Sequence, residues 1–215
     1  MRHLTVVAAS GLAGETISAA RATGRFVTIE VVDDDPLLRG TRVAGALVRG
    51  GLDEIGDHDN RDVVVCAGKG LVRRVLVERL LAHGVSPHRF ATIIHPRATV
   101  AAEADVGSGC VILAGVVVTA NAVIGDHVVV MPQVTLTHDD TVADFATLCA
   151  GVALGGSVHV REAAYVGMSA CVREGTTVGA GSTLGMGAVL LDDLPDGQTW
   201  VGAPARPLVR QGVAV

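Results

Sequence analysis

The chain has 215 residues, of which 49% are apolar and only 2% aromatic, and its formal net charge is −5. It contains no basic block, so we expect no nucleic-acid partner, and no apolar run reaches the roughly 18 residues of a membrane span. The four cysteines show no paired spacing and the apolar run 4–9 is too short for a secretory leader, which together predict reduced thiols and a cytoplasmic protein.

The first 90 residues alternate runs that favour strands with runs that favour helices. We expect strands at 4–8, 26–32, 42–48 and 63–67, and helices at 15–23 and 71–83. This alternation predicts a small, Rossmann-like α/β domain with a parallel sheet.

Parallel sheets of this kind bind ligands at the carboxyl ends of their strands. Here those ends carry residues 10–14, 33–35 and 68–70, and a glycine-rich turn that opens a helix can hold phosphate. The sequence has no GxGxxG motif, however, so the same segments are equally compatible with the ordinary turns of a packing domain.

A strict period of six begins at Ile94 and ends at Leu190. Every sixth residue in this range is Ile, Val or Leu, in seventeen consecutive positions without a slip. Such a period is neither helical nor simple strand alternation, and it is typical of a parallel β-helix built from hexapeptide repeats. Three hexapeptides make one coil of eighteen residues, so range 91–191 predicts an all-β prism of about five and a half coils, roughly 26 Å tall at the usual strand spacing.

The residue two places before each large apolar residue is small and points to the same interior. From Ala98 to Ala188 it is Ala, Val, Cys, Ser or Thr at fifteen of sixteen places, and the exception is Asp140. Either the coil is locally distorted and the side chain points elsewhere, or a carboxyl group enters the apolar interior. Burial would then favour the neutral carboxyl, which could donate a hydrogen bond near His138.

His138, which Asp139 follows directly, is the candidate for chemistry. Imidazole suits proton transfer near neutral pH, and an adjacent carboxylate can hold its tautomer and raise its basicity. Eighteen residues away in each direction, on the same column of the prism, lie Ala120 and Gly156, which leave room beside the ring for a ligand. The backbone N–H at Gly156 could stabilise a developing oxyanion. The alternative is that the two side chains are an ordinary solvent-exposed pair at a corner of the prism, without a chemical role.

A zinc site of the kind found in β-helical carbonic anhydrases needs three convergent histidines. His127 and His159 lie on other columns than His138, so we expect no bound metal.

With the six-residue period, the His138-Asp139 pair and the closing run 201–206 (Val-Gly-Ala-Pro-Ala-Arg), the chain resembles the left-handed β-helix acyltransferases. It resembles specifically the branch that contains sialic acid O-acetyltransferases and the N-acetyltransferases of bacillosamine and perosamine. Further markers are the Ser-Gly turn after the first strand, the double aspartate after the second, and Ile94-His95-Pro96 at the junction. The resemblance covers nearly the whole chain.

The resemblance implies a homotrimer of parallel prisms, active sites between subunits, acetyl-CoA as the donor and a nucleotide-linked sugar as the acceptor. It implies that His138 is the general base, that Asp139 orients it, and that the Gly156 N–H steadies the oxyanion. The implied CoA-binding residues are Gly185 and Gly187 and, in the C-terminal segment 192–215, Gly202, Ala203, Pro204 and Arg206. The implied acceptor-binding residues are Ser10, Gly11, Leu12, Asp33, Asp34 and Lys69. The left hand of the coil also comes only from the resemblance.

Three departures from the family's pattern concern the acceptor side. Leu12 stands where the family usually has a histidine that reaches the acceptor, Lys69 where it has asparagine, and Thr147 where some members have a second histidine. Lys69 or Arg73 is available for a diphosphate. A non-sugar acceptor, or an inactive trimeric scaffold, are the alternatives. Because no loop interrupts the period, enclosure of the His138 corner must come from the N-terminal domain or from neighbouring subunits.

Overall fold

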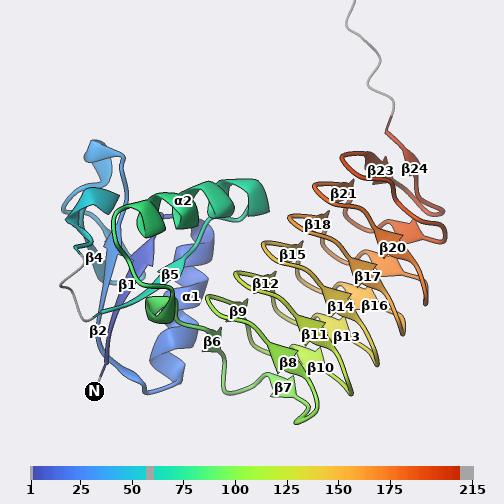
Figure 1. The fold of residues 1–215 in the computed structure, drawn as a ribbon, viewed down its shortest axis with the longest axis horizontal. Helices are drawn as coiled ribbons and strands as arrows, with labels where there is room; N and C mark the ends of the chain where they lie inside the picture. Colours follow the sequence, from blue (N-terminus) through green and yellow to red (C-terminus); the bar gives the residue numbers. More distant parts are fainter. Residues whose placement is uncertain (1, 57–60, 209–215) are drawn as a thin grey trace, which may run out of the picture.

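The computed structural model describes residues 2–56 and 61–208, which form two parts (Figure 1). A small α/β part lies at one end, and a stack of short strands extends from it to the other end. No helix within the described ranges is long and apolar enough to cross a membrane.

The α/β part contains a five-stranded sheet in the order β3-β4-β2-β1-β5. Its strands are β1 (Arg2–Val7), β2 (Phe26–Val32), β3 (Arg42–Val43), β4 (Ala46–Gly50) and β5 (Asp62–Val65); its helices are α1 (Gly11–Ala22) and α2 (Gly70–Ala82), with single 3-10 turns η1 (Pro36–Leu38), η2 (Leu52–Glu54) and η3 (Pro87–Arg89). All pairs are parallel except β3 with β4. The prediction of one strand at 42–48 is wrong, because Ala44 and Gly45 adopt φ of 44° and 81° and fold the segment into a hairpin.

Helix α1 begins four residues earlier than the sequence suggested. Ser10 caps it, since the Ser10 hydroxyl accepts a hydrogen bond from the backbone N–H of Ala13 at 3.2 Å. Gly11 and Gly14 are weak helix formers, and they concealed the first turn in the sequence pattern.

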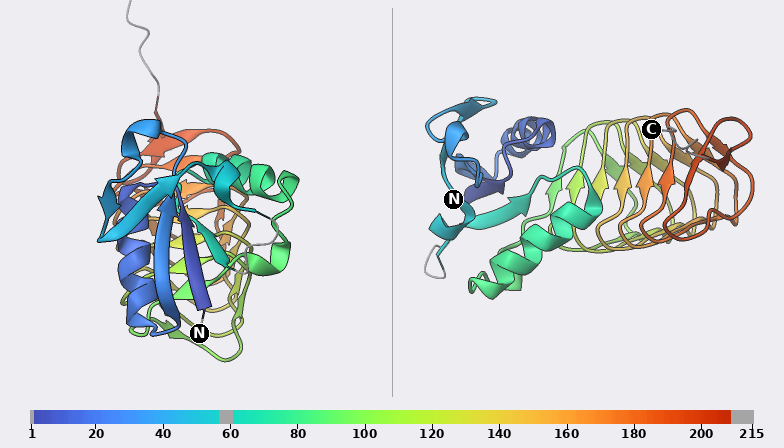
Figure 2. Two further views of the ribbon diagram at one scale, coloured as in Figure 1. Left: turned by 90° about the vertical axis from the view of Figure 1, so that its left-hand side faces the viewer. Right: turned by 90° about the horizontal axis from the view of Figure 1, so that it is seen from above.

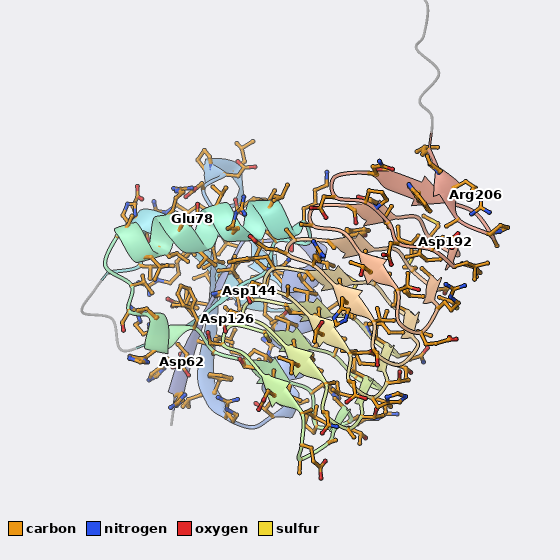
Figure 3. All side chains as sticks on the ribbon, turned by 45° about the vertical axis from the view of Figure 1, so that its right-hand side comes forward. Asp62, Glu78, Asp126, Asp144, Asp192 and Arg206 are labelled. Carbon is orange, nitrogen blue, oxygen red and sulfur yellow. The ribbon has the colours of Figure 1, made fainter. Side chains whose placement is uncertain are left out.

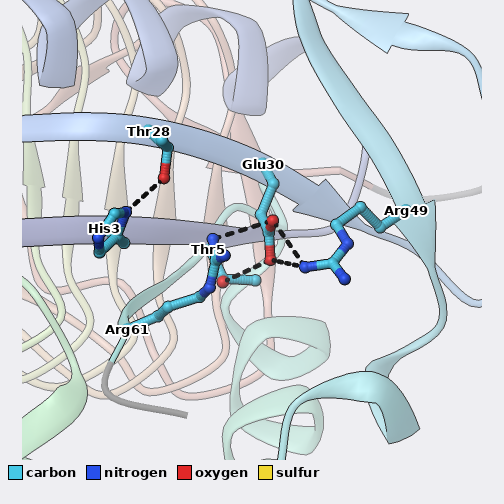
Figure 4. A network of polar contacts seen from close by, with 6 residues as sticks. All are labelled: His3, Thr5, Thr28, Glu30, Arg49 and Arg61. Atoms are coloured by element: carbon cyan, nitrogen blue, oxygen red, sulfur yellow. Dashed lines mark hydrogen bonds and ion pairs between the residues drawn. The ribbon is translucent and has the colours of Figure 1, made fainter.

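A polar network joins three strands on one face of the sheet (Figure 4). Glu30 of β2 forms ion pairs with Arg49 of β4 at 3.0 Å and with Arg61 at 2.9 Å. The hydroxyl of Thr5, on β1, donates to the same carboxylate at 3.4 Å. Because the Glu30 side chain is only 15% exposed, these donors balance a charge that is largely withdrawn from water.

The second part is a three-sided prism of two-residue strands that start every six residues. The strands are β6 (Ile93–Ile94), β7 (Thr99–Val100), β8 (Asp105–Val106), β9 (Val111–Ile112), β10 (Val117–Val118), β11 (Val123–Ile124), β12 (Val129–Val130), β13 (Thr135–Leu136), β14 (Thr141–Val142), β15 (Thr147–Leu148), β16 (Ala153–Leu154), β17 (His159–Val160), β18 (Tyr165–Val166), β19 (Cys171–Val172), β20 (Thr177–Val178), β21 (Thr183–Leu184) and β22 (Val189–Leu190), followed by β23 (Thr199–Val201) and β24 (Arg206–Pro207). The second residue of each strand from β6 to β22 is one of the seventeen large apolar residues, so the predicted period is confirmed.

Three parallel sheets form the faces of the prism. The first face contains β6, β9 and every third strand to β21, with β23 and β24 at its end; the second runs from β7 to β22, and the third from β8 to β20. The large and small inward residues pack into one continuous apolar core.

From residue 109 to residue 187, each corner of the prism places one residue in the left-handed backbone region. These residues recur every sixth position: Gly109, Gly115, Asn121, His127, Gln133, Asp139, Phe145, Gly151, Ser157, Ala163, Ser169, Gly175, Gly181 and Gly187. Glycine, asparagine and aspartate accept this conformation most easily, which explains the polar and glycine-rich corners of the sequence.

The α/β part packs on the first face and on the edge between the third and first faces, beside the first coils (Figures 1 and 2). Val111 and Val129 of the first face belong to the same apolar cluster as Leu12 and Ile17 of α1. On the edge, an added Cβ at Gly70 of α2 would overlap a backbone carbonyl of the prism. The two parts therefore share a core and a close backbone approach.

Arg73 of α2 is fully buried in this joint. Its guanidinium donates to the backbone carbonyls of His127 at 2.7 Å and Phe145 at 2.7 Å, and to the Thr147 hydroxyl at 3.1 Å. That hydroxyl in turn donates to the Gly68 carbonyl at 2.9 Å. Burial lowers the pKa of Arg73 to about 10, which leaves it charged at neutral pH.

Candidate active site

His138 lies at the corner between β13 and β14, where the chain passes from the second face to the third. Its Nδ1 is 2.8 Å from Oδ2 of Asp139. A carboxylate only accepts, so this contact places the proton of the neutral ring on Nδ1 and leaves Nε2 as the basic nitrogen. The two side chains are 66% and 52% exposed, so a substrate can reach the ring.

Asp139 is held from the preceding coil by Asn121, whose side-chain amide donates to Oδ1 at 3.1 Å. Hydrogen bonds from His138 and then from Asn121 keep the pKa of Asp139 below its ordinary value, so the carboxyl is ionised at neutral pH. Sequence reasoning missed Asn121. It stands eighteen residues before Asp139 on the same column, and that spacing is the signal that could have found it.

Gly156 lies one coil beyond His138, and its backbone faces the ring. A Cβ built at this position would overlap the imidazole at Nε2 and Cε1, so glycine leaves room for the ring in its observed orientation. The N–H of Ser157 donates to the His138 carbonyl at 2.9 Å, one of several hydrogen bonds between the two coils. Among the residues that the structure describes, the Gly156 N–H has no hydrogen-bond acceptor, so it remains available to a bound group.

Asp140 enters the interior of the prism and is fully buried. Its two oxygens accept hydrogen bonds from the backbone N–H of Thr137 at 2.7 Å and of Val158 at 2.9 Å. The alternative that the side chain points away from the interior is therefore wrong, and among the described residues Asp140 forms no hydrogen bond with His138. Burial raises the pKa of Asp140 to about 6, against the lowering effect of these two N–H groups.

An open hollow of about 440 Å³ lies on the third face, the face that begins after the His138 corner. Thr141, His159 and Thr177, the first residues of β14, β17 and β20, line it together with Arg161 and Glu162. His159 Nδ1 is 2.6 Å from the Thr141 hydroxyl. Sequence reasoning did not identify this hollow, although its three strand residues recur at intervals of eighteen. Within the described ranges, no group of three or more His, Cys, Asp or Glu side chains could hold a metal ion.

A smaller cavity of about 190 Å³ lies at the carboxyl ends of β1 and β2 and is lined partly by Asp33 and Asp34. Asp33 accepts hydrogen bonds from the backbone N–H groups of Ala9 at 2.7 Å and Asp35 at 2.9 Å. Asp34 accepts from the Leu52 N–H and from Arg79, and these bonds keep its pKa below the ordinary value. The double aspartate thus forms the polar side of a cavity, which Ala8, Leu52 and Leu76 complete, where the sequence predicted an acceptor site.

The neighbouring turn residues have different environments. The Ser10 hydroxyl caps α1 and donates to the Cys66 carbonyl at 2.6 Å. Gly11 is exposed with open space beside it, whereas Leu12 is only 6% exposed and packs in the apolar core. Of these three, Gly11 is the one that presents backbone to solvent.

Lys69, the only lysine of the chain, is exposed at the start of α2, beyond the end of β5. Arg73 was the other cation expected to serve a diphosphate, and that expectation is wrong. Its guanidinium is buried and is used by carbonyl groups of the joint, because α2 packs that face against the prism.

The candidate CoA-binding residues lie on a different part of the prism from His138. Gly185 and Gly187 belong to the corner between β21 and β22, at the edge between the first and second faces. Residues 202–205 connect β23 to β24, and Arg206, the first residue of β24, marks the end of the prism far from the α/β part (Figure 3). One chain therefore does not bring Gly185 and His138 to the same edge.

Comparison with solved structures gives matches over nearly the whole chain. A mutant of perosamine N-acetyltransferase from Caulobacter crescentus, in complex with CoA and GDP-perosamine, is 30% identical, with 98% of each chain covered and a TM-score of 0.89. The acetyltransferase domain of PglB from Neisseria gonorrhoeae is 36% identical, with 97% of this chain and 100% of that chain covered and a TM-score of 0.87. WeeI from Acinetobacter baumannii is 27% identical, with 97% and 100% covered and a TM-score of 0.87. No protein-family model matches the sequence, and the search of curated proteins gave no match.

These likenesses include both the α/β part and the prism, in the same order and at full length. The chain belongs to the left-handed β-helix acyltransferases. Within that family it falls in the branch of perosamine N-acetyltransferase, and the resemblance drawn from the sequence is confirmed together with the predicted fold class.

Proposed function

We propose that the protein is an acetyl-CoA-dependent acyltransferase that acylates an amine or hydroxyl of a nucleotide-linked sugar. The observation that carries the proposal is the exposed His138-Asp139 pair beside the open Gly156 backbone. It occurs in a chain that matches N-acetyltransferases along its whole length, one of them with CoA and GDP-perosamine bound. The N-acetyltransferase neighbours favour an amine as the acceptor group.

In the proposed reaction, Nε2 of His138 removes the proton from the acceptor as its nitrogen or oxygen attacks the thioester carbonyl. Asp139 stabilises the imidazolium that forms, because its ionised carboxylate already bonds Nδ1–H. The Gly156 N–H donates to the oxyanion of the tetrahedral intermediate. Collapse of that intermediate breaks the carbon–sulfur bond, and the imidazolium returns the proton to the leaving thiolate.

We further propose that the active site is completed by a second subunit of a homotrimer. The α/β part packs on the first face, and His138 lies at the edge opposite that face, between the second and third faces. The acceptor-binding candidates of one chain are therefore on the wrong side of the prism for its own His138. In a homotrimer, a neighbouring subunit can supply what the chain itself does not bring to His138. Its α/β part and its edge with Gly185 and Gly187 would face this histidine.

In this arrangement residues 1–90 bind the acceptor, 91–191 supply the catalytic corner, and 192–215 help to bind CoA. On the acceptor side, Asp33 and Asp34 line the small cavity, Ser10 and Gly11 lie in the turn after β1, and Lys69 supplies the exposed cation for a diphosphate. On the donor side, Gly187, Gly202, Ala203, Pro204 and Arg206 lie toward the far end of the prism.

Replacement of His138 by alanine tests the proposal. We expect the turnover number to fall by about 10²–10⁴, the usual contribution of a general base. Thiol release from acetyl-CoA would be measured with a panel of nucleotide-linked amino sugars. His88→Ala, which removes an exposed histidine of η3, is the matched control and should retain full activity. Full activity of His138→Ala would exclude His138 as the base, and failure of the wild-type protein to bind CoA in calorimetry would favour the inactive scaffold.

A further inference from the structure

The ladder between coils is interrupted at the His138 corner. On this edge the residue after each large apolar residue donates its N–H to a carbonyl of the next coil: Ala101 to Val118, Thr119 to Leu136, Gly155 to Val172 and Arg173 to Leu190, at 2.9–3.1 Å. Thr137 alone departs from this series. Its N–H turns to the Asp140 carboxylate at 2.7 Å, and its hydroxyl donates to the Leu154 carbonyl at 3.1 Å instead.

The strand pairing shows the same interruption. Neighbouring two-residue strands on this face pair through both residues, as in β10 with β13 and β16 with β19. Strands β13 and β16 pair only through Thr135 and Ala153. The gap in the ladder thus falls between the coil that carries His138 and the coil that carries Gly156.

The Asp140 carboxylate spans this gap. Its second oxygen accepts the N–H of Val158, on the coil of Gly156, at 2.9 Å. A buried carboxylate is costly unless its oxygens are satisfied, so each of the two N–H groups is strongly favoured in its observed place. Movement of either coil at this corner would leave a charge unsatisfied inside a largely apolar core.

We propose that Asp140 is a positioning residue, whose carboxylate bridges Thr137 and Val158 and so holds the His138 ring and the Gly156 backbone at the separation that the reaction needs. This inference rests on the proposed function, because Asp140 acts through His138 and touches no substrate itself. The small residues at the other fifteen inward positions fill the core without such a bridge.

Asp140→Ala tests the proposal, since alanine is the commonest type of residue at the equivalent positions. A displacement of about 1 Å at a reacting group can cost up to 10²-fold in rate, so we expect a turnover number at least about 10-fold lower with the CoA dissociation constant within about twofold. The matched control is Ser182→Ala, which removes a buried hydrogen bond to the Gly179 carbonyl at an equivalent inward position. It should lower the melting temperature and leave the turnover number of the folded protein unchanged.

A double-mutant cycle separates a positioning role from a general structural one. If Asp140 acts through His138, adding Asp140→Ala to His138→Ala should reduce the residual rate by less than about twofold. A reduction as large as in the wild-type background would overturn the proposal, as would a wild-type turnover number for folded Asp140→Ala. If that variant does not fold, Asp140→Asn, which keeps one acceptor oxygen, replaces it under the same criteria. An active His138→Ala protein would instead indicate failure of the proposed function.

Discussion

Asp139 combines an unusual backbone conformation with its proposed role as the partner of His138. Its φ is 61°, a region that asparagine and aspartate accept more readily than other residues with side chains. The effect of Asp139→Ala would therefore combine backbone strain with loss of the charge, whereas Asp139→Asn removes the charge and preserves the backbone conformation.

We predict that Asp139→Asn lowers the turnover number by about 10²–10⁴, because the amide no longer stabilises the imidazolium or fixes the tautomer. Steady-state thiol release would measure the loss, and unchanged thermal stability would show that the corner is intact. Asn121→Ala, which removes the amide donor to Asp139, should have a smaller effect in the same assay. Equal activity of Asp139→Asn and wild type would contradict the assigned role.

The second prediction at this scale concerns pH. Burial raises the pKa of Asp140 to about 6 from 3.8, so between these values the folded state binds more protons than the unfolded state. The contribution of Asp140 to stability therefore falls as pH rises from about 4 to 6. The hydrogen bonds from the Val158 and Thr137 N–H groups, and then the interactions with His138 and His159, lower the pKa of this carboxyl and lessen the effect.

Urea unfolding of wild type and Asp140→Asn at several pH values would check this. The neutral amide does not titrate, so the variant should gain stability relative to wild type across the range from about pH 4 to pH 6. A constant difference between the two proteins over that range would show that Asp140 has an ordinary pKa.

Among the elements, α2 has a structural function that its sequence does not reveal. It is attached to the prism through the buried Arg73, while its neighbour Arg74 forms an exposed ion pair with Glu162 at 2.7 Å. The two adjacent arginines thus provide an internal comparison between a buried and an exposed guanidinium.

We predict that Arg73→Met destabilises the protein by about 3 kcal/mol or more, since it leaves several buried carbonyl groups without donors. Arg74→Met should change the free energy of unfolding by less than about 1 kcal/mol, as is usual for an exposed pair. Chemical denaturation of both variants measures the difference. Equal effects would mean that Arg73 does not hold the joint together.

The strands and the position of the proposed catalytic corner were predictable because they follow a period. Each large apolar residue from Ile94 to Leu190 lies in its expected strand, and the adjacent His138 and Asp139 interact as their order suggested. The burial of Arg73 was not predictable, because the sequence pattern predicts that the side chain of an arginine on a helix lies at the surface. The side of the prism on which the α/β part packs carries no periodic signal either.

At the scale of the whole molecule, the opposite positions of the α/β part and His138 have a direct consequence. If each active site combines His138 of one chain with the acceptor domain of another, two defective proteins can complement each other. Mixed trimers of His138→Ala and Lys69→Glu, which reverses the exposed charge on the acceptor side, would contain some sites with both groups intact.

We predict that co-refolding or co-expression of these two variants restores part of the activity that each lacks alone. Thiol release by the mixture would be compared with the sum of the separate proteins, and with a mixture of His138→Ala and Asp139→Asn, whose defects share one corner and cannot complement. Activity no greater than the sum would place both halves of the site in one chain, and sedimentation would report whether trimers form.

Because no loop interrupts the stack of coils, the number of residues sets distances along the prism axis. Because each eighteen residues add roughly 4.8 Å, the height from His138 to Leu190 is set by residue number alone, at about three coils or roughly 14 Å. Duplication or deletion of one eighteen-residue unit between them would change this height in a single step and leave both ends chemically intact. Adding or removing such units could therefore match the enzyme to acyl donors of different length, without redesign of either binding surface.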